Sequence, residues 1–349
     1  MHLLWMDLAR ALAVLGVIVI HASADVITEW GGVPDSWWWA ANLFDSLARG
    51  CVPIFVMISG ALLLPVSEGC RDFFRKRANR ILLPFVAWTL FYLVWKKLFS
   101  QPDLGWVEAL RQAAGNGVYY HLWFLYLILG LYLLTPVFRI LVAHCSRRNL
   151  LYFLGLWFVV ASALPCLEKL IALLTHQTFH IAIPIEPAQG FIGYFVLGYF
   201  LHQYVTEGAA RKALVAWPAA LALCTGGTYF LTRHCRSFQG VLYDSMAPNV
   251  VIYAASFLVL AKCSGPFLEL RVSPYAKKLI HRVSAASFGI YLVHPVFLET
   301  LSSGRLGFTL TSRMFHPAWT IPLTAAAVFL LSLISIRILQ KIPYLKRIV

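Results

Sequence analysis

The chain has 349 residues, of which 60% are hydrophobic and only 13% are charged. Soluble domains carry about 25% charged residues, so this composition excludes an ordinary soluble protein and predicts an all-α polytopic membrane protein. The net charge of +14 does not indicate nucleic acid binding. The excess of Lys and Arg has two readings, membrane topology with contacts to membrane lipids, or a site for a polyanion.

Ten apolar stretches are long enough to cross a bilayer, which takes about 17–25 helical residues. They lie near residues 5–27, 39–64, 79–99, 120–142, 150–168, 190–206, 212–231, 247–263, 284–302 and 318–340. We therefore predict about ten transmembrane helices. The sixth and eighth stretches are the shortest, and the sixth is interrupted by Gly193 and Gly198.

The distribution of basic residues predicts the orientation of the chain. Nineteen of the 29 Lys and Arg residues fall in one set of alternate connections and in the C-terminal tail, and eight fall in the other set. Cytoplasmic loops are enriched in these residues, so both termini are predicted to be cytoplasmic. The first segment shows no cleavage site and is expected to stay as a membrane helix. We expect one transmembrane domain over residues 1–349, with no appended soluble domain.

The first apolar segment contains Arg10 and His21, eleven positions apart. This is about three helical turns, so both side chains lie on one face, roughly 16 Å apart. An ionisable residue at the centre of a bilayer costs at least ~2.5 kcal/mol, so such residues usually face a protein-lined cavity. Asp7 can pair with Arg10, either to hold the guanidinium or to set topology. Asp25 lies one turn after His21, which makes His21 a candidate general base or a hydrogen-bonded core residue.

The second apolar segment carries a possible ion pair near mid-membrane. Asp45 and Arg49 are at i, i+4 spacing, and Gly50 and Pro53 weaken the helix directly afterwards. Such interruptions tend to line cavities, where the freed backbone groups find partners. Arg49 is either a structural partner of Asp45 or a ligand for an anionic or carbonyl-bearing substrate. Ser59-Gly60 indicates a close contact between helices.

Basic residues at the predicted inner edge form candidate phosphate sites. Arg77 and Arg80 are close together at the start of the third segment, where the guanidinium fork and the helix dipole both suit phosphate. The sorting of positive residues to the cytoplasm is the alternative explanation. A second group precedes the ninth segment and consists of Lys277, Lys278 and Arg282.

The fourth segment opens with a row of aromatic residues around His121 and Trp123. An aromatic belt at the membrane interface explains such a row. A stacking platform for a sugar is the functional alternative. The ninth segment has Ser287, Tyr291 and His294 at helical spacing, so one face of it is polar. His294 is expected at a depth close to that of His21.

The seven cysteines show no CxxC or Cys/His spacing typical of a metal site, and no metal is expected. Cys166 and Cys235 fall in predicted outward loops. They are either unpaired or joined in a disulfide.

Together these motifs resemble the acyltransferase 3 family of integral membrane acyltransferases. The family's first-helix pattern, Asp-x-x-Arg with a His eleven residues after the Arg, is matched here by Asp7, Arg10 and His21. Its later patterns correspond to Arg49 to Phe55 with Ser59-Gly60, to Arg77, Arg80 and Ile81, to residues 121–124, and to Ser287, Tyr291, Leu292 and His294. The usual Arg-Gly of the first helix is Arg10-Ala11 in this chain.

The resemblance implies a bacterial inner-membrane O-acyltransferase. Its donor would be acetyl-CoA from the cytoplasm, and its acceptor a hydroxyl of a cell-surface or lipid-linked glycan on the outer side. By this resemblance His21 is the general base, or forms an acyl-histidine, and Arg10 or Arg49 positions the donor or stabilises negative charge. Arg77 and Arg80 would meet the phosphates of CoA. A transporter or exporter of a lipid-linked glycan or small anion is the alternative, in which the same charges line a substrate pathway.

Overall fold

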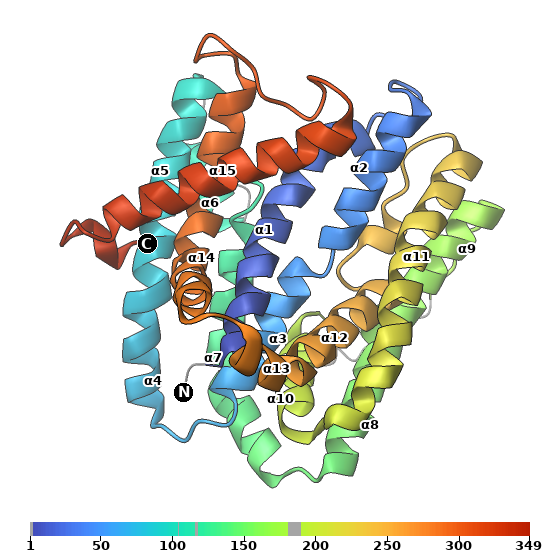
Figure 1. Ribbon diagram of the computed structural model, residues 1–349, viewed down its shortest axis with the longest axis vertical. Coiled ribbons are helices and arrows are strands. Elements are labelled where there is room, and N and C mark those ends of the chain that lie inside the picture. The colour runs from blue at the N-terminus through green and yellow to red at the C-terminus, as the bar shows by residue number, and fades with distance from the viewer. Residues whose placement is uncertain (1–2, 104, 116–117, 181–189) are drawn as a thin grey trace. The chain divides into compact units, whose positions relative to one another are not determined.

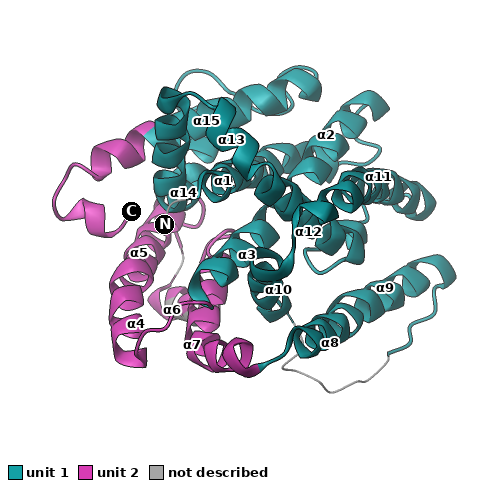
Figure 2. Cartoon of the chain, turned by 60° about the horizontal axis from the view of Figure 1, so that its bottom comes forward, with its two compact units in different colours: residues 1–64, 145–333 teal, residues 65–144, 334–349 magenta. Residues whose placement is uncertain are grey.

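The computed structural model describes residues 3–103, 105–115, 118–180 and 190–349. The described part is all-helical and contains no strand. Its contacts divide the chain into two compact units, residues 1–64 with 145–333 and residues 65–144 with 334–349 (Figure 2).

The first unit holds most of the long helices (Figure 1). They are α1 (Leu4–Ile27), α2 (Asp35–Ala48), α3 (Cys51–Leu63), α8 (Arg147–Trp157), α9 (Leu164–Thr175), α10 (Ile192–Tyr204), α11 (Ala210–Cys235), α12 (Pro248–Cys263), α13 (Gly265–Arg271), α14 (Pro274–Ser302) and α15 (Pro317–Leu339). Short pieces η2 (Phe158–Ala163), η4 (Glu207–Ala209) and η5 (Val241–Tyr243) connect them. The boundary between the units falls within α15, after Leu333.

The second unit consists of α4 (Cys70–Arg77), η1 (Ala78–Leu82), α5 (Leu83–Phe99), α6 (Trp106–Ala114), α7 (Trp123–His144) and η6 (Leu345–Arg347). The helix from α4 to α5 is continuous through η1, a π-helical stretch that ends where Pro84 enters the first turn of α5. The C-terminal end of the chain is attached to α5, because the Trp88 indole N–H donates to the carbonyl of Ile348 at 2.8 Å.

Nine segments of the described residues are long and apolar enough to cross a membrane, and they correspond to nine of the ten predicted spans. The exception is the sixth, which forms the 13-residue helix α10. A helix of this length spans only about 20 Å, less than the ~30 Å of the hydrocarbon core. Its short length explains why α10 is not among the nine candidate spans.

The contacts between α1 and α14 show that α10 also reverses the chain. Asp7 of α1 contacts Ser284 of α14, and His21 contacts His294, so the two helices run in parallel. Every crossing reverses the direction of the chain, so an odd number of crossings must separate two parallel spans. Six candidate spans lie between α1 and α14 among the described residues. Counting α10 makes seven, which supports the predicted ten crossings.

Close backbone contact joins α10 to α3. A Cβ atom added to Gly198 would lie 1.9 Å from the carbonyl oxygen of Met57, and one added to Gly60 would lie 1.8 Å from that of Phe195. Small residues allow such an approach, which is how helices associate where no water drives them together. The predicted close contact at Ser59-Gly60 is therefore confirmed.

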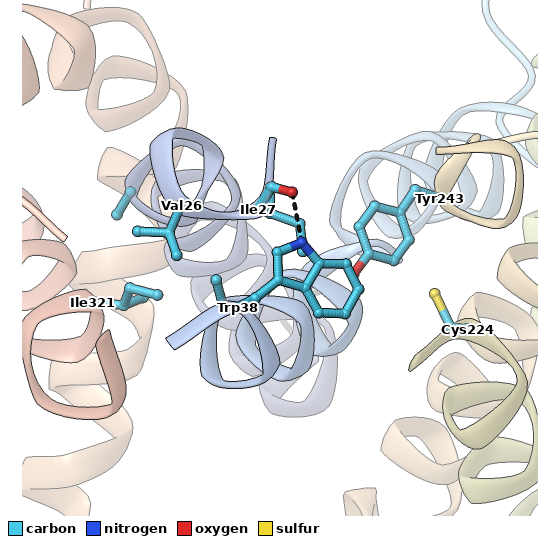
Figure 3. Close-up of a cluster of buried hydrophobic side chains, with 8 residues drawn as sticks. Val26, Ile27, Trp38, Cys224, Tyr243 and Ile321 are labelled. Atoms are coloured by element: carbon cyan, nitrogen blue, oxygen red, sulfur yellow. Dashed lines mark hydrogen bonds between the residues drawn. The ribbon is translucent and has the colours of Figure 1, made fainter. Parts of the chain in front are cut away.

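A core of apolar side chains joins α1, α2, α11, η5 and α15 in the first unit (Figure 3). Trp38 is buried at its centre, and its indole N–H donates to the carbonyl of Ile27 at 2.9 Å. Tyr243 belongs to the same core (Figure 3). The core therefore fixes the position of Tyr243 relative to α2.

The contact at Gly198 gives a direct test of this packing. Gly198→Ala should destabilise the protein by about 1–3 kcal/mol, because the added methyl group meets backbone rather than a flexible side chain. Unfolding of the purified protein in mixed detergent micelles measures this change. Gly226→Ala is the control, since a Cβ there meets nothing within 4 Å in the described structure. Equal stability of the two variants would contradict the close contact.

Candidate active site

Two histidines from α1 and α14 lie face to face in the first unit. The ring centroids of His21 and His294 are 5.4 Å apart and the planes are inclined by 23°. This agrees with the prediction that the two residues share a depth. His294 is fully buried, whereas His21 keeps intermediate exposure. His21 is thus the more accessible ring of the pair.

A backbone contact determines how His294 carries its proton. Its Nδ1 lies 2.7 Å from the carbonyl oxygen of Tyr291. A carbonyl only accepts hydrogen bonds, so Nδ1 must carry the hydrogen and donate it. In the neutral ring the lone pair is therefore on Nε2.

The opposite end of the same helix pair is joined by Asp7. Its Oδ1 accepts a hydrogen bond from the Ser284 hydroxyl at 2.6 Å, and its Oδ2 lies 3.1 Å from Nδ1 of His281. Both oxygens are thus engaged by α14, which the sequence did not indicate. Arg10 lies on the same continuous helix as His21 and is partly buried. Its pairing with Asp7 stays a prediction.

Arg49 lies in the turn between α2 and α3, where the predicted interruption occurs. Its Nε and Nη2 both bind Oδ1 of the fully buried Asp45, which confirms the predicted i, i+4 pair. The Asp45 Oδ2 accepts from the Ser23 hydroxyl of α1 at 2.9 Å. The Arg49 side chain is 23% exposed. It is therefore anchored at one side and accessible at another.

The interruption at Gly50 also has a steric reason. A Cβ atom at this position would lie 2.7 Å from the ring of Tyr253. The Tyr253 hydroxyl donates to the carbonyl of Leu47 at 2.6 Å, which satisfies one of the carbonyls left open at the end of α2. The turn that carries Arg49 is thus held from α12.

The other side of the guanidinium faces Tyr243 of η5. The Arg49 Cζ lies 4.2 Å from the centroid of this ring. The Tyr243 hydroxyl donates to the Asn42 side chain and accepts from Ser46 at 3.3 Å. The polar residues Asn42 and Ser46 stood out in an apolar segment, but no motif marked Tyr243, which lies in a predicted loop. Sequence reasoning missed all three.

Arg49 and the histidine pair belong to one site. Asp45 binds both Arg49 and the hydroxyl of Ser23, which lies two residues after His21 on α1. The neighbour found for His21 is His294 rather than the Asp25 carboxylate, because the Asp25 side chain is exposed and its carbonyl accepts from Arg313. The first unit therefore brings together a histidine, a cation and a second histidine.

The other residues predicted on α14 line the same face. Tyr291 is buried, and its ring centroid is 5.9 Å from that of His294. The Ser287 hydroxyl is buried and donates to the carbonyl of Ser284 at 2.8 Å. The hydroxyl of Ser287 is therefore hydrogen bonded within its own helix. The polar face predicted for this segment is present.

In the second unit, two guanidinium groups lie beside a buried phenyl ring. The Cζ atoms of Arg77 and Arg139 are 5.2 Å and 4.6 Å from the centroid of Phe73. The Nε of Arg77 is buried and has no hydrogen-bond partner among the described residues. Arg80 is exposed. Of the two predicted phosphate-binding arginines, Arg77 is thus the one with a buried N–H that can still donate a hydrogen bond.

Glu68, in the loop before α4, binds Arg139, one of the two guanidinium groups at this ring, and also Lys76. Its Oε2 accepts from Lys76 at 2.9 Å and its Oε1 from Arg139 at 3.1 Å. These hydrogen bonds, first that of Lys76 and then that of Arg139, hold the pKa of Glu68 below its ordinary value.

The second set of predicted phosphate-binding residues lies at the start of α14, and its members have different surroundings. The Lys277 ammonium donates to the carbonyl of Glu269 at 2.6 Å and to its carboxylate at 2.9 Å. Lys277 thus joins α13 to α14, which favours a structural function. Lys278 and Arg282 are exposed.

His121 lies within the second unit, just before α7, and is buried. Its ring packs edge-on against Tyr92 at 4.9 Å and lies near Tyr119 and Tyr120. Trp123 is partly exposed at the start of α7. The enclosure of His121 favours packing over an open sugar platform at this position.

All seven cysteines, Cys166 and Cys235 included, are free thiols. No group of three or more His, Cys, Asp or Glu residues within the described ranges is arranged to hold a metal ion.

The long apolar helices of the described residues define the chain as an integral membrane protein. A family model described as an acyltransferase domain, that of the acyltransferase 3 family, matches residues 3–337. The chain belongs to this family. It is an acyltransferase of the membrane, and the match covers helices of both units. Comparisons with curated proteins and with solved structures gave no match.

The lowered pKa of Glu68 predicts a pH-dependent contribution to stability. The ionised side chain stabilises the fold above the unfolded pKa of about 4.3, and this stabilisation is lost as the pH falls through the lower folded pKa. The melting temperature of the wild type should therefore exceed that of Glu68→Gln at neutral pH, and this difference in melting temperature should shrink below about pH 4. Thermal unfolding in detergent measures it. Glu108→Gln, which alters an exposed pair, is the control, and a pH-independent difference would contradict the prediction.

Proposed function

We propose that this protein moves an acetyl group from cytoplasmic acetyl-CoA to a hydroxyl of a cell-surface or lipid-linked glycan on the outer side of the bacterial inner membrane. The observation that carries the proposal is the partly exposed His21, stacked on buried His294 on the helix that Ser23 joins to the Asp45–Arg49 pair. A histidine supplies the base that a hydroxyl nucleophile needs, and a cation stabilises the charge that develops in acyl transfer.

In the proposed reaction, His21 takes the proton of the acceptor hydroxyl as its oxygen attacks the thioester carbonyl. The tetrahedral intermediate then collapses, and the C–S bond breaks. The sulfur of CoA leaves as a thiolate and takes up the proton that His21 had accepted. The products are the ester and free CoA, and His21 is neutral again.

Arg49 has the geometry of an oxyanion donor. Its Nε and one Nη2 hydrogen are taken up by Asp45. The remaining N–H groups of the guanidinium are available for the carbonyl oxygen of the donor, on which negative charge grows. The pairing with Asp45 keeps the cation in place without leaving an isolated charge inside the bilayer.

His294 supports the base. Its protonation form is set by the Tyr291 carbonyl, so its stacked ring gives His21 a defined neighbour. Two imidazolium ions at this separation repel each other, so the pair is suited to carry one proton at a time.

We assign the phosphates of CoA to basic residues at the cytoplasmic edge. Arg77, with its buried and unpartnered Nε, and the exposed Arg80 are the first candidates, followed by Lys278 and Arg282. Lys277 contributes less, since Glu269 holds its ammonium. Arg10, on the His21 face of α1, would contact the pantetheine arm.

Acceptor binding is assigned to the His21 end of α1. Tyr291 and Ser287 line the neighbouring face of α14. Trp123, which is partly exposed at the start of α7, is a candidate for contacts with the sugar. With both termini cytoplasmic, the His21 end of α1 is directed outward and Arg10 toward the donor.

The first test removes the base. His21→Ala should lower the rate of acetyl transfer by roughly 10²–10⁴-fold, the usual contribution of a positioned general base. Purified protein in detergent, incubated with radiolabelled acetyl-CoA and membrane glycan extract, gives the rate. Binding of CoA should change little, because the ring acts on the acceptor hydroxyl.

His234→Ala is the matched control, since His234 is exposed at the end of α11. Normal transfer by His21→Ala would contradict the proposed base. A wild-type protein that neither consumes nor hydrolyses acetyl-CoA would favour the alternative of a transporter. The mass of surface glycans from cells with and without the gene identifies the acceptor.

The second test concerns the donor. The double variant Arg77→Ala, Arg80→Ala should raise the KM for acetyl-CoA about tenfold or more and change kcat less, because phosphate contacts are made equally in ground and transition states. Arg148→Ala, an exposed basic residue at the start of α8, is the control. An unchanged KM in the double variant would remove these residues from the donor site.

A further inference from the structure

We propose that Tyr243 is a positioning residue that sets the orientation of the Arg49 guanidinium for acyl transfer. The inference rests on the proposed function, because it concerns how Arg49 is aimed at the reacting carbonyl. Tyr243 belongs to η5, in a connection that carries none of the sequence motifs.

Asp45 alone leaves the guanidinium one degree of freedom. The Nε and Nη2 groups of Arg49 bind the same oxygen, Oδ1, while Ser23 occupies Oδ2. Two N–H groups that share one acceptor fix the direction of the fork, but they leave its plane able to tilt about that oxygen. A second contact is needed to set the plane.

The ring of Tyr243 supplies this contact. The Cζ of Arg49 lies 4.2 Å from the ring centroid, well inside the ~6 Å range of cation–π attraction. The attraction is strongest over the face of the ring, so the ring restrains the tilt of the cation. The guanidinium is thus held between Asp45 and Tyr243.

The ring itself is firmly placed. The Tyr243 hydroxyl donates to the side chain of Asn42 and lies 3.3 Å from the Ser46 hydroxyl. The residue is only 3% exposed and belongs to the apolar core around Trp38 (Figure 3). A ring fixed at its hydroxyl and along its edges cannot follow a moving cation, so it determines the orientation of Arg49.

The test compares two substitutions. Tyr243→Leu removes the ring and should lower kcat roughly tenfold or more, with little change in the KM for acetyl-CoA, as expected when an oxyanion donor is misplaced. Tyr243→Phe keeps the ring and should therefore keep most of the wild-type kcat. Equal losses in both variants would overturn the inference, since the hydroxyl rather than the ring would then matter.

Tyr229→Leu is the matched control. Tyr229 packs against the same core, with its ring centroid 6.0 Å from that of Trp38, but its hydroxyl accepts from Arg233 and its ring is not the one over the Arg49 guanidinium. Loss of this ring should affect stability more than kcat. The same fall of kcat in Tyr229→Leu and Tyr243→Leu would indicate a general packing defect and overturn the positioning function.

A chemical rescue separates orientation from folding. Methylguanidinium ion added to Arg49→Ala should restore part of the transfer activity by occupying the space between Asp45 and Tyr243. In the double variant Arg49→Ala, Tyr243→Leu, half-maximal rescue should require a concentration about tenfold higher, since most of the cation–π attraction is gone. Equal concentrations would overturn the inference.

A double-mutant cycle tests the contact without any activity. The shifts in melting temperature of Arg49→Ala and Tyr243→Leu should not add, because each removes the same contact. Additive shifts would overturn the inference even for an inactive protein. If Arg49→Ala transfers acetyl groups normally, the proposed function of Arg49 fails. If Arg49→Ala is impaired but Tyr243→Leu transfers acetyl groups normally, only the positioning inference fails.

Discussion

The requirement that ionisable groups inside a bilayer be paired determines how the first unit is built. An unpaired carboxylate or guanidinium at such depth is unfavourable by several kcal/mol. Asp7 is accordingly bound by α14, and Asp45 by Arg49 and Ser23. These pairs connect α1 with α14 and α1 with α2, so the polar contacts specify which helices are neighbours. Apolar packing, as around Trp38, then fills the space between them.

The same pairing prepares the site for chemistry. A cation held by a buried carboxylate keeps its charge in the membrane and needs little rearrangement when an oxyanion forms. The stacked rings of His21 and His294 lie at the same end of the α1 and α14 pair. Because these helices are parallel, Asp7 at one end and the histidines at the other fix their register. A polar contact near the N-terminal end of α1 thus helps to place a ring many residues away.

The second unit uses charge differently. Arg77 and Arg139 lie beside a single buried ring, Phe73, and the carboxylate of Glu68, in the loop before α4, binds Arg139 and Lys76. This arrangement concentrates positive charge while holding the side chains in place, which suits the binding of a phosphate-bearing donor. The family match extends over both units, so each contributes to one acyltransferase domain.

The class of fold, the apolar spans and the residues with unusual chemistry could all be predicted from the amino-acid sequence. Helical spacing was enough to place Arg10 and His21 on one face and to pair Asp45 with Arg49, because both relations are local. It could not show that His294 stacks on His21, that His281 and Ser284 bind Asp7, or that Tyr243 covers Arg49. Those contacts join residues more than 190 positions apart, and only the packing of helices decides which distant side chains meet.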